Sequence, residues 1–343
     1  MLFIPYRADL QFTHLPWVTI AVCLLCVFVY FQQASSDSDL EPAARAYCAK
    51  QHPRRFWLTV EKVTGTRTRD RCAELVEVMH ASGRAEAVIP ALAAQAAHWD
   101  TMGARVSRDY TAAGLTAMDA EFARTVPPTL TARLVFDPAH SSFTRMFTAA
   151  VAHAGWDHLI GNLFFFFAFA AMVEIAVGPV VYAALLLELA FGTHLAYALT
   201  QIATHRSVPT LGLSGVVSGT IGLFTYLAPQ ARIRCFAWFL FFWRTYAVPG
   251  WILAAWFVGW DVYNLLHDDG ASNVNFVAHV SGAFLGYCTG VGFLGGARDR
   301  VQSELSSGAR PGAARAGPAR TPRSSSRGRG SVARPRDPPR PPR

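Results

Sequence analysis

The sequence predicts an all-α membrane protein, and three observations support that fold class. Of its 343 residues, 52% are hydrophobic and only 16% are charged, which is too apolar for an ordinary soluble protein. The apolar residues form blocks of roughly 17–25, the length that a helix needs to cross a bilayer. Polar residues that are rare in membranes recur near one end of several blocks. We therefore expect a bundle of six transmembrane helices.

Charged loops, glycine and proline separate the apolar blocks and set their boundaries. The first block resembles a secretory signal, but its flank carries one arginine, Arg7, offset by Asp9, so a signal anchor fits better. Pro179 begins the third block, and Pro229 follows the fourth. The expected spans are 16–33, 157–178, 179–202, 213–227, 248–265 and 275–294.

The polar stretch between the first two spans predicts a small helical extramembrane insert. Residues 35–140 hold thirteen Lys or Arg and thirteen Asp or Glu, with too few large apolar residues for a big core. The aromatic residues 235–247, broken by Arg244, are expected to lie at the membrane interface. The domain prediction is a lead-in and first helix at 1–33, the insert at 34–142, a core at 143–296 and a tail at 297–343.

The tail is expected to be disordered, because its Arg, Pro, Ser and Gly cannot bury enough apolar surface to fold. It holds twelve arginines between Arg298 and Arg343. The positive-inside rule therefore places both termini in the cytoplasm, and the neutral insert and the Asp268/Asp269 loop outside. A bacterial inner membrane fits this topology. In an oxidising compartment Cys48 and Cys72 of the insert could form a disulfide.

With this topology, spans two, four and six all enter the membrane from the outer face. The second opens with His158 and Asn162, spaced i and i+4 and therefore on one face. Ser214 opens the fourth, and His279 lies about one turn inside the sixth. The topology therefore places the four side chains in one layer below the outer surface.

Glycines accompany both the serine and the histidine. Gly212 and Gly215 leave the Ser214 hydroxyl uncrowded, while Gly215 and Gly219 form a flat helix face. Gly282 and Gly286 continue the face of span six that includes His279. Small residues let two membrane helices approach closely enough for a serine and an imidazole to hydrogen-bond.

These residue types predict acyl transfer by an activated serine. His279 would take the Ser214 proton and return it to the leaving amine. The Ser214 N–H, the Asn162 side chain and His158 are the candidate oxyanion donors. Spans two, four and six offer no carboxylate at matching depth, so a Ser–His dyad is expected. The six cysteines lack metal-ligand spacing, and neither a metal nor a cofactor is expected.

Three motifs make the chain resemble the rhomboid intramembrane serine proteases. They are GLSG at 212–215, AHVSG at 278–282 and HAGWDHLIGN at 153–162. Arg145 is similar to the arginine of a Trp-Arg loop motif, and Glu174 to a structural glutamate. The resemblance covers roughly residues 143–295 plus the first span, and implies a rhomboid-type six-helix bundle.

The resemblance implies that Ser214 is the nucleophile, that His279 is the base, and that His158 and Asn162 belong to the oxyanion hole. It also implies substrates that are transmembrane proteins, cut near the outer end of a span. Two residues depart from the family pattern: Thr144 replaces a tryptophan, and Ser218 replaces an aromatic residue that packs on the histidine. Something else must then orient His279.

Two other functions fit the same composition. One is an inactive relative that binds and escorts membrane clients, although such proteins typically lose the serine or the histidine. The other is a transporter that uses Ser214, His279 and Glu188, which requires polar groups through the full membrane depth. The expected partners are transmembrane substrates and the lipid bilayer. The arginine tail fits anionic lipid or solvent better than nucleic acid.

Overall fold

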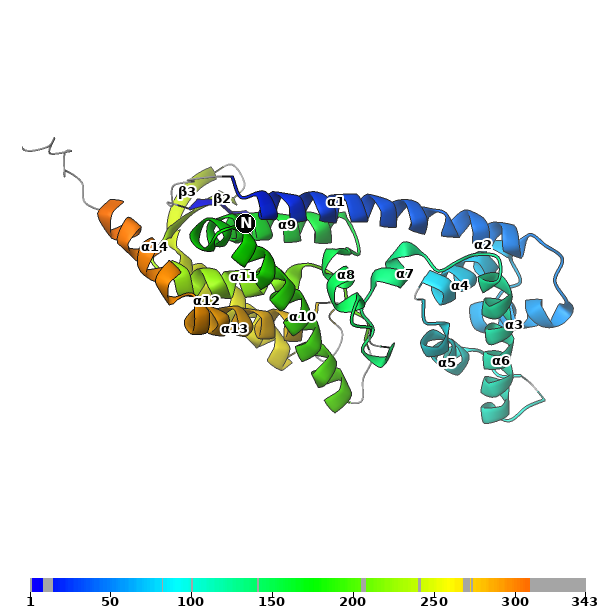
Figure 1. Ribbon diagram of the computed structural model, residues 1–343. Helices are drawn as coiled ribbons and strands as arrows, with labels where there is room; N and C mark the ends of the chain where they lie inside the picture. The colour runs from blue at the N-terminus through cyan, green and yellow to red at the C-terminus, as the bar shows by residue number, and fades with distance from the viewer. Residues whose placement is uncertain are drawn as a thin grey trace, which may run out of the picture.

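The computed structural model describes residues 2–8, 15–81, 83–99, 101–140, 142–204, 208–239, 242–267, 272 and 274–308. It consists of a helical bundle and a second group of helices, connected by one long helix, α1, that runs along the top of the bundle (Figure 1). The predictions for the tail beyond 308 and for the Asp268/Asp269 loop lie outside the described residues.

Most of the predicted membrane spans are helices with nearly the predicted bounds. Four stretches are long and apolar enough to cross a membrane, namely Trp17–Cys48 and the helices α9, α10 and α13; α11 is apolar but shorter. The count of six spans therefore stays a prediction. The bundle helices are α1 (Trp17–Ser38), α8 (Arg145–Val151), α9 (Trp156–Val177), α10 (Pro179–Ala203), α11 (Ser214–Leu227), α12 (Gly250–His267) and α13 (Phe276–Phe293).

The junction between α9 and α10 shows how the sequence sets these bounds. Gly178 has φ of 87°, a left-handed conformation that residues with side chains rarely adopt, and it ends α9. Pro179 then begins α10 at the one helical position that needs no N–H. A glycine followed by a proline thus separates two long apolar helices.

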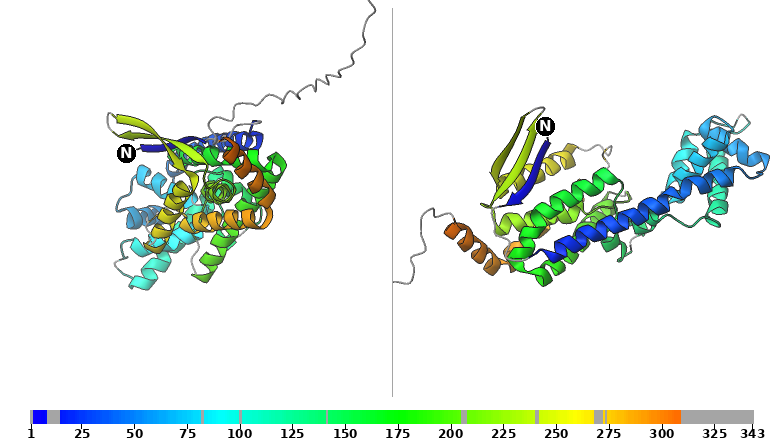
Figure 2. Two further views of the ribbon diagram at one scale, coloured as in Figure 1. Left: turned by 90° about the vertical axis from the view of Figure 1, so that its left-hand side faces the viewer. Right: turned by 90° about the horizontal axis from the view of Figure 1, so that it is seen from above.

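The centre of the bundle is α11, whose residues are almost all buried. Seen from the side of the bundle, it lies end-on with other helices around it (Figure 2). Its buried side chains share one apolar core with residues of α1, α9 and α10, including Phe166, Phe169, Leu189 and Phe224. The helix that begins with Ser214 is therefore surrounded by its neighbours.

The prediction of an all-α chain is wrong for two segments. Strands β2 (Arg232–Phe239) and β3 (Phe242–Pro249) form an antiparallel hairpin, and β1 (Leu2–Ala8) pairs with β2. The described residues of 235–247, a segment expected to be interfacial and aromatic, lie in these two strands. Aromatic and β-branched residues favour strands, and two such runs joined by a short turn are a hairpin pattern.

The segment between α1 and α8 is helical and has a core of its own. Phe56, Leu115 and Phe122 are buried in it, and a disulfide joins Cys48 to Cys72. The sequence predicts only a minor core here. The elements are α2 (Leu40–Cys48), α3 (Arg54–Thr64), α4 (Arg69–Ala81), α5 (Ala85–Gln95), α6 (Ala104–Ala123), α7 (Leu130–Leu134) and the 3-10 helix η1 (Pro138–His140).

The first residues of the expected disordered tail are helical. Residues Gly295–Gly308 form helix α14, which packs on the bundle. Ala297 and Val301 are buried, and Gln302 donates a hydrogen bond to the backbone oxygen of Leu227 at 2.9 Å. Apolar residues spaced four apart are enough to dock this turn of helix, although the segment is polar overall.

Candidate active site

Ser214 is the first residue of α11, and the loop before it is tightly constrained. Gly212 has φ of 123°, and its N–H donates to the Ala149 oxygen at 2.8 Å. The first helical hydrogen bond runs from the Val217 N–H to the Leu213 oxygen, so the N–H of Ser214 lies among the free donors of a helix start. Gly212 therefore supports the loop and is no oxyanion donor, while the Ser214 amide is available.

Glycines line the interface between α11 and α13. A side-chain carbon added at Gly282 would overlap the backbone oxygen of Gly215. One added at Gly286 would overlap the backbone oxygen of Gly219. The two backbones are thus in contact at two successive turns, as small residues allow in membrane helix pairs.

The beginnings of α11 and α13 are also connected by hydrogen bonds. Asn275 caps α13, since its Oδ1 accepts from the Ala278 N–H at 3.0 Å, and its Nδ2 donates to the Thr210 Oγ1 at 3.1 Å. Thr210 lies four residues before Ser214, and Asn275 lies four before His279. Together with the glycine contacts, this register brings the serine and the histidine to the same end of one interface.

His158 of α9 closes this end of the interface. A side chain at Gly212 would lie 2.8 Å from His158 Nε2, so the ring edge covers the loop before Ser214. The Nδ1 atom of His158 accepts from the Ala154 N–H at 3.4 Å, which leaves the proton on Nε2, the atom that faces Gly212. His158 is also close enough to His279 for their charges to interact.

Asn162 points along its own helix. Its Nδ2 donates to the backbone oxygen of His158 at 2.9 Å, and the residue is buried. The side chain supports the turn that carries His158. This bond uses one of the two N–H donors of the amide, so the other remains for an oxyanion.

The expectation that no carboxylate orients the histidine is wrong. Asp261 of α12 places its Oδ1 3.2 Å from His279 Nδ1, and 17% and 15% of the two side chains are exposed. The sequence argument considered only spans two, four and six, whereas Asp261 lies on the fifth. Its one visible signal is a lone carboxylate within an apolar block.

Glu174 and Arg145 lie away from the serine. The buried Glu174 carboxylate accepts from the Val18 and Thr19 N–H groups at 2.9 and 2.8 Å and from the Thr19 hydroxyl at 2.7 Å. It therefore caps the first turn of α1 from α9. Arg145 begins α8, and Ser218 is buried one turn after Ser214.

A buried glutamine connects α1 with the loop before His158. The Gln33 Oε1 accepts from the His153 N–H at 3.0 Å, and its Nε2 donates to Thr131 at 2.9 Å. The His153 ring is buried and lies 5.3 Å from that of His158, edge to face. Sequence reasoning missed Gln33, since a lone glutamine at a helix end has no distinctive pattern.

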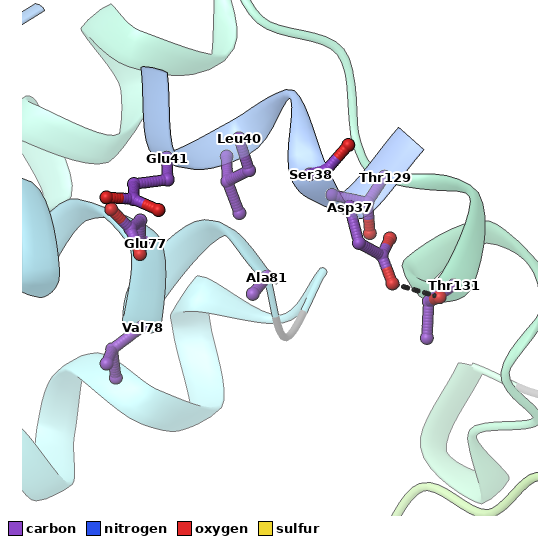
Figure 3. A pocket seen from close by; sticks show the side chains of 9 residues that line it. All are labelled: Asp37, Ser38, Leu40, Glu41, Glu77, Val78, Ala81, Thr129 and Thr131. Atoms are coloured by element: carbon purple, nitrogen blue, oxygen red, sulfur yellow. Dashed lines mark hydrogen bonds between the residues drawn. The ribbon is translucent and has the colours of Figure 1, made fainter. Parts of the chain in front are cut away.

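A hollow that is formed by described residues lies elsewhere. A cavity of about 570 Å³ lies between the end of α1, α2, α4 and α7, and Asp37, Glu41 and Glu77 are in its lining. Figure 3 shows Asp37 turned to Thr131, to which it is hydrogen-bonded. None of the residues expected at the active site lines this cavity. The described residues contain no group of three potential metal ligands.

The fold and this site define a class: a helical membrane domain with a serine and a histidine on two helices in backbone contact. Residues 140–296 match the family described as Rhomboid domain. The chain therefore contains a rhomboid domain, and proteins of this family are typically intramembrane serine proteases. The match contains both Ser214 and His279, and excludes α1 and the helices α2–α7. Comparison with curated proteins and with solved structures gives no match.

Proposed function

We propose that the protein is an intramembrane serine endopeptidase that cleaves transmembrane proteins near the outer face of the membrane. The observation that carries the proposal is the glycine-lined contact of α11 and α13, whose register brings Ser214 and His279 to one end of the interface. The rhomboid match over the same helices supports it.

The proposed reaction follows from the groups at this end. The Ser214 Oγ attacks the scissile carbonyl carbon while His279 Nε2 accepts the hydroxyl proton, and a tetrahedral oxyanion forms. The Ser214 N–H and the Nε2–H of His158 donate to that oxygen. His279 then protonates the leaving amine, and the C–N bond breaks. A water molecule, deprotonated by His279, releases the acyl group and restores the serine.

The proposed location is the bacterial inner membrane, with both termini in the cytoplasm. The Cys48–Cys72 disulfide supports placing the insert outside, because disulfides persist in oxidising compartments. The transmembrane topology then puts the beginnings of α9, α11 and α13 on that same outer side, so water reaches the site from outside.

The test is cleavage of a model transmembrane substrate by the purified full chain in detergent or vesicles. Ser214→Ala and His279→Ala should each lower kcat by roughly 10⁴-fold or more, because the two groups act as a unit. Ser218→Ala, on the same helix one turn away, is the matched control and should cleave normally. Cleavage by both active-site variants would refute the proposal.

The rival functions give other results. An unmodified protein that binds but never cleaves transmembrane clients would favour the escort function. Transport is less well supported, because the Glu188 carboxylate already accepts a hydrogen bond from the Thr289 hydroxyl at 2.5 Å. That contact connects α10 to α13 and leaves Glu188 engaged in packing.

A further inference from the structure

The contact between Asp261 and His279 is unusual for its place in the fold. The buried residues of α12 are Gly250, Leu253 and Ala254, all in its first turns, and the half that carries Asp261 has none. Packing therefore does not force the carboxylate against α13. An ionisable side chain in an apolar helix is costly, and it persists when it has a partner with a function.

The atoms in contact determine what Asp261 can do. Its Oδ1 lies 3.2 Å from Nδ1, which is ion-pair distance, so the carboxylate faces this nitrogen and favours the tautomer that carries the proton there. The lone pair of Nε2 is then free to accept the proton of a serine. When His279 becomes an imidazolium, the same carboxylate faces the new positive charge.

No other described group competes for this role. The charged or titratable groups that face His279 are Asp261 from α12 and His158 from α9. From α10, Glu188 reaches α13 only at Thr289, ten residues further along. The Phe276 ring is 6.2 Å away and edge-on, so it does not hold the imidazole by stacking.

We propose that Asp261 is a positioning residue that orients His279 and stabilises its protonated form, so that the site works as a Ser214–His279–Asp261 triad. This inference rests on the proposed protease function. Asp261 does not touch substrate: it acts through the imidazole, by holding the tautomer before the attack and the charge after it. The fifth span thereby contributes to the chemistry of the fourth and sixth.

The test compares Asp261→Asn with Asn264→Ala, a change on the same helix one turn away whose side chain bonds only within α12. Asp261→Asn should lower kcat by about 10- to 100-fold with KM nearly unchanged, because the attraction between the carboxylate and the imidazolium is lost in the transition state. Without the carboxylate, the acidic limb of the kcat/KM profile should move to lower pH, since protonation of His279 becomes less favourable. Asp261→Glu, which keeps the charge, should return the acidic limb of the kcat/KM profile to its original pH.

Two further measurements separate the possible failures. Labelling of Ser214 by a fluorophosphonate reports the proposed serine chemistry in the unmodified chain. If the unmodified chain neither labels nor cleaves, the protease proposal itself fails. If it does both, and Asp261→Asn cleaves within about twofold of Asn264→Ala with the same pH profile, the triad is overturned. If Asp261→Asn does not fold, Asp261→Ser is measured in its place, and its cleavage rate and pH profile are compared with those of Asn264→Ala in the same way.

Discussion

Adding one methyl group at Gly286 should disable the site from a distance. A Cβ there would lie 2.8 Å from the carbonyl carbon of Gly219 and overlap its oxygen, whereas ordinary contacts begin at 3.4 Å. Because the obstacle is backbone, α11 and α13 must separate by more than the difference of 0.6 Å, since the oxygen is closer still than the carbon. A misplacement of about 1 Å can cost roughly 100-fold in rate, and we expect this loss in kcat for Gly286→Ala.

The matched control is Gly292→Ala on the same helix, where an added Cβ meets nothing within 4 Å. The assay is cleavage of a transmembrane substrate, with thermal unfolding measured in parallel, since overpacking should also destabilise the bundle by about 1–3 kcal/mol. If Gly286→Ala retains kcat within about twofold of Gly292→Ala, the close approach of the helices is not what assembles the site.

Three other predictions test the surrounding structure. Alkylation without reductant should label the exposed Cys288 but neither Cys48 nor Cys72, and reduction should destabilise the insert by about 3 kcal/mol, as for a disulfide that spans 24 residues. Glu174→Ala leaves three donors of α1 unpaired and should lower the free energy of unfolding by about 3 kcal/mol, measured in denaturant. Burial lowers the pKa of His153 to about 4 from 6.5, so the unfolded chain binds more protons between these values. Stability should fall by about 3 kcal/mol as the pH drops through that window, and His153→Asn should abolish most of this fall.

The candidate site shows where sequence reasoning ends. Ser214, His279 and the glycines around them lie on helices whose spacing and topology are local patterns, so their meeting can be predicted from hydropathy and small-residue periodicity. Asp261 gives no such pattern. Its partner lies across a loop on another helix, and only the rotation of α12 against α13 determines that the carboxylate faces the imidazole.

The fold shows the same difference between local sequence patterns and contacts of distant segments. Residues 235–247 are predicted to be interfacial because Arg244 breaks their aromatic run, whereas the structure pairs this region as strands and adds a third strand from the N-terminus. The insert has a core because helices that are distant in the sequence each contribute a few large buried side chains, such as Phe122. In each case the missing information is a contact between distant segments.

The sequence by itself determined that the chain is a bundle of apolar helices, where its main helices begin and end, and that the serine and the histidine lie on two glycine-faced helices. It could do so because apolar length, glycine and proline act within a few residues along the chain. Only the tertiary structure decided that Asp261 faces His279, that Cys48 joins Cys72, and that the N-terminal strand pairs with β2. Those contacts depend on how whole elements rotate and pack, and no local window of residues encodes that.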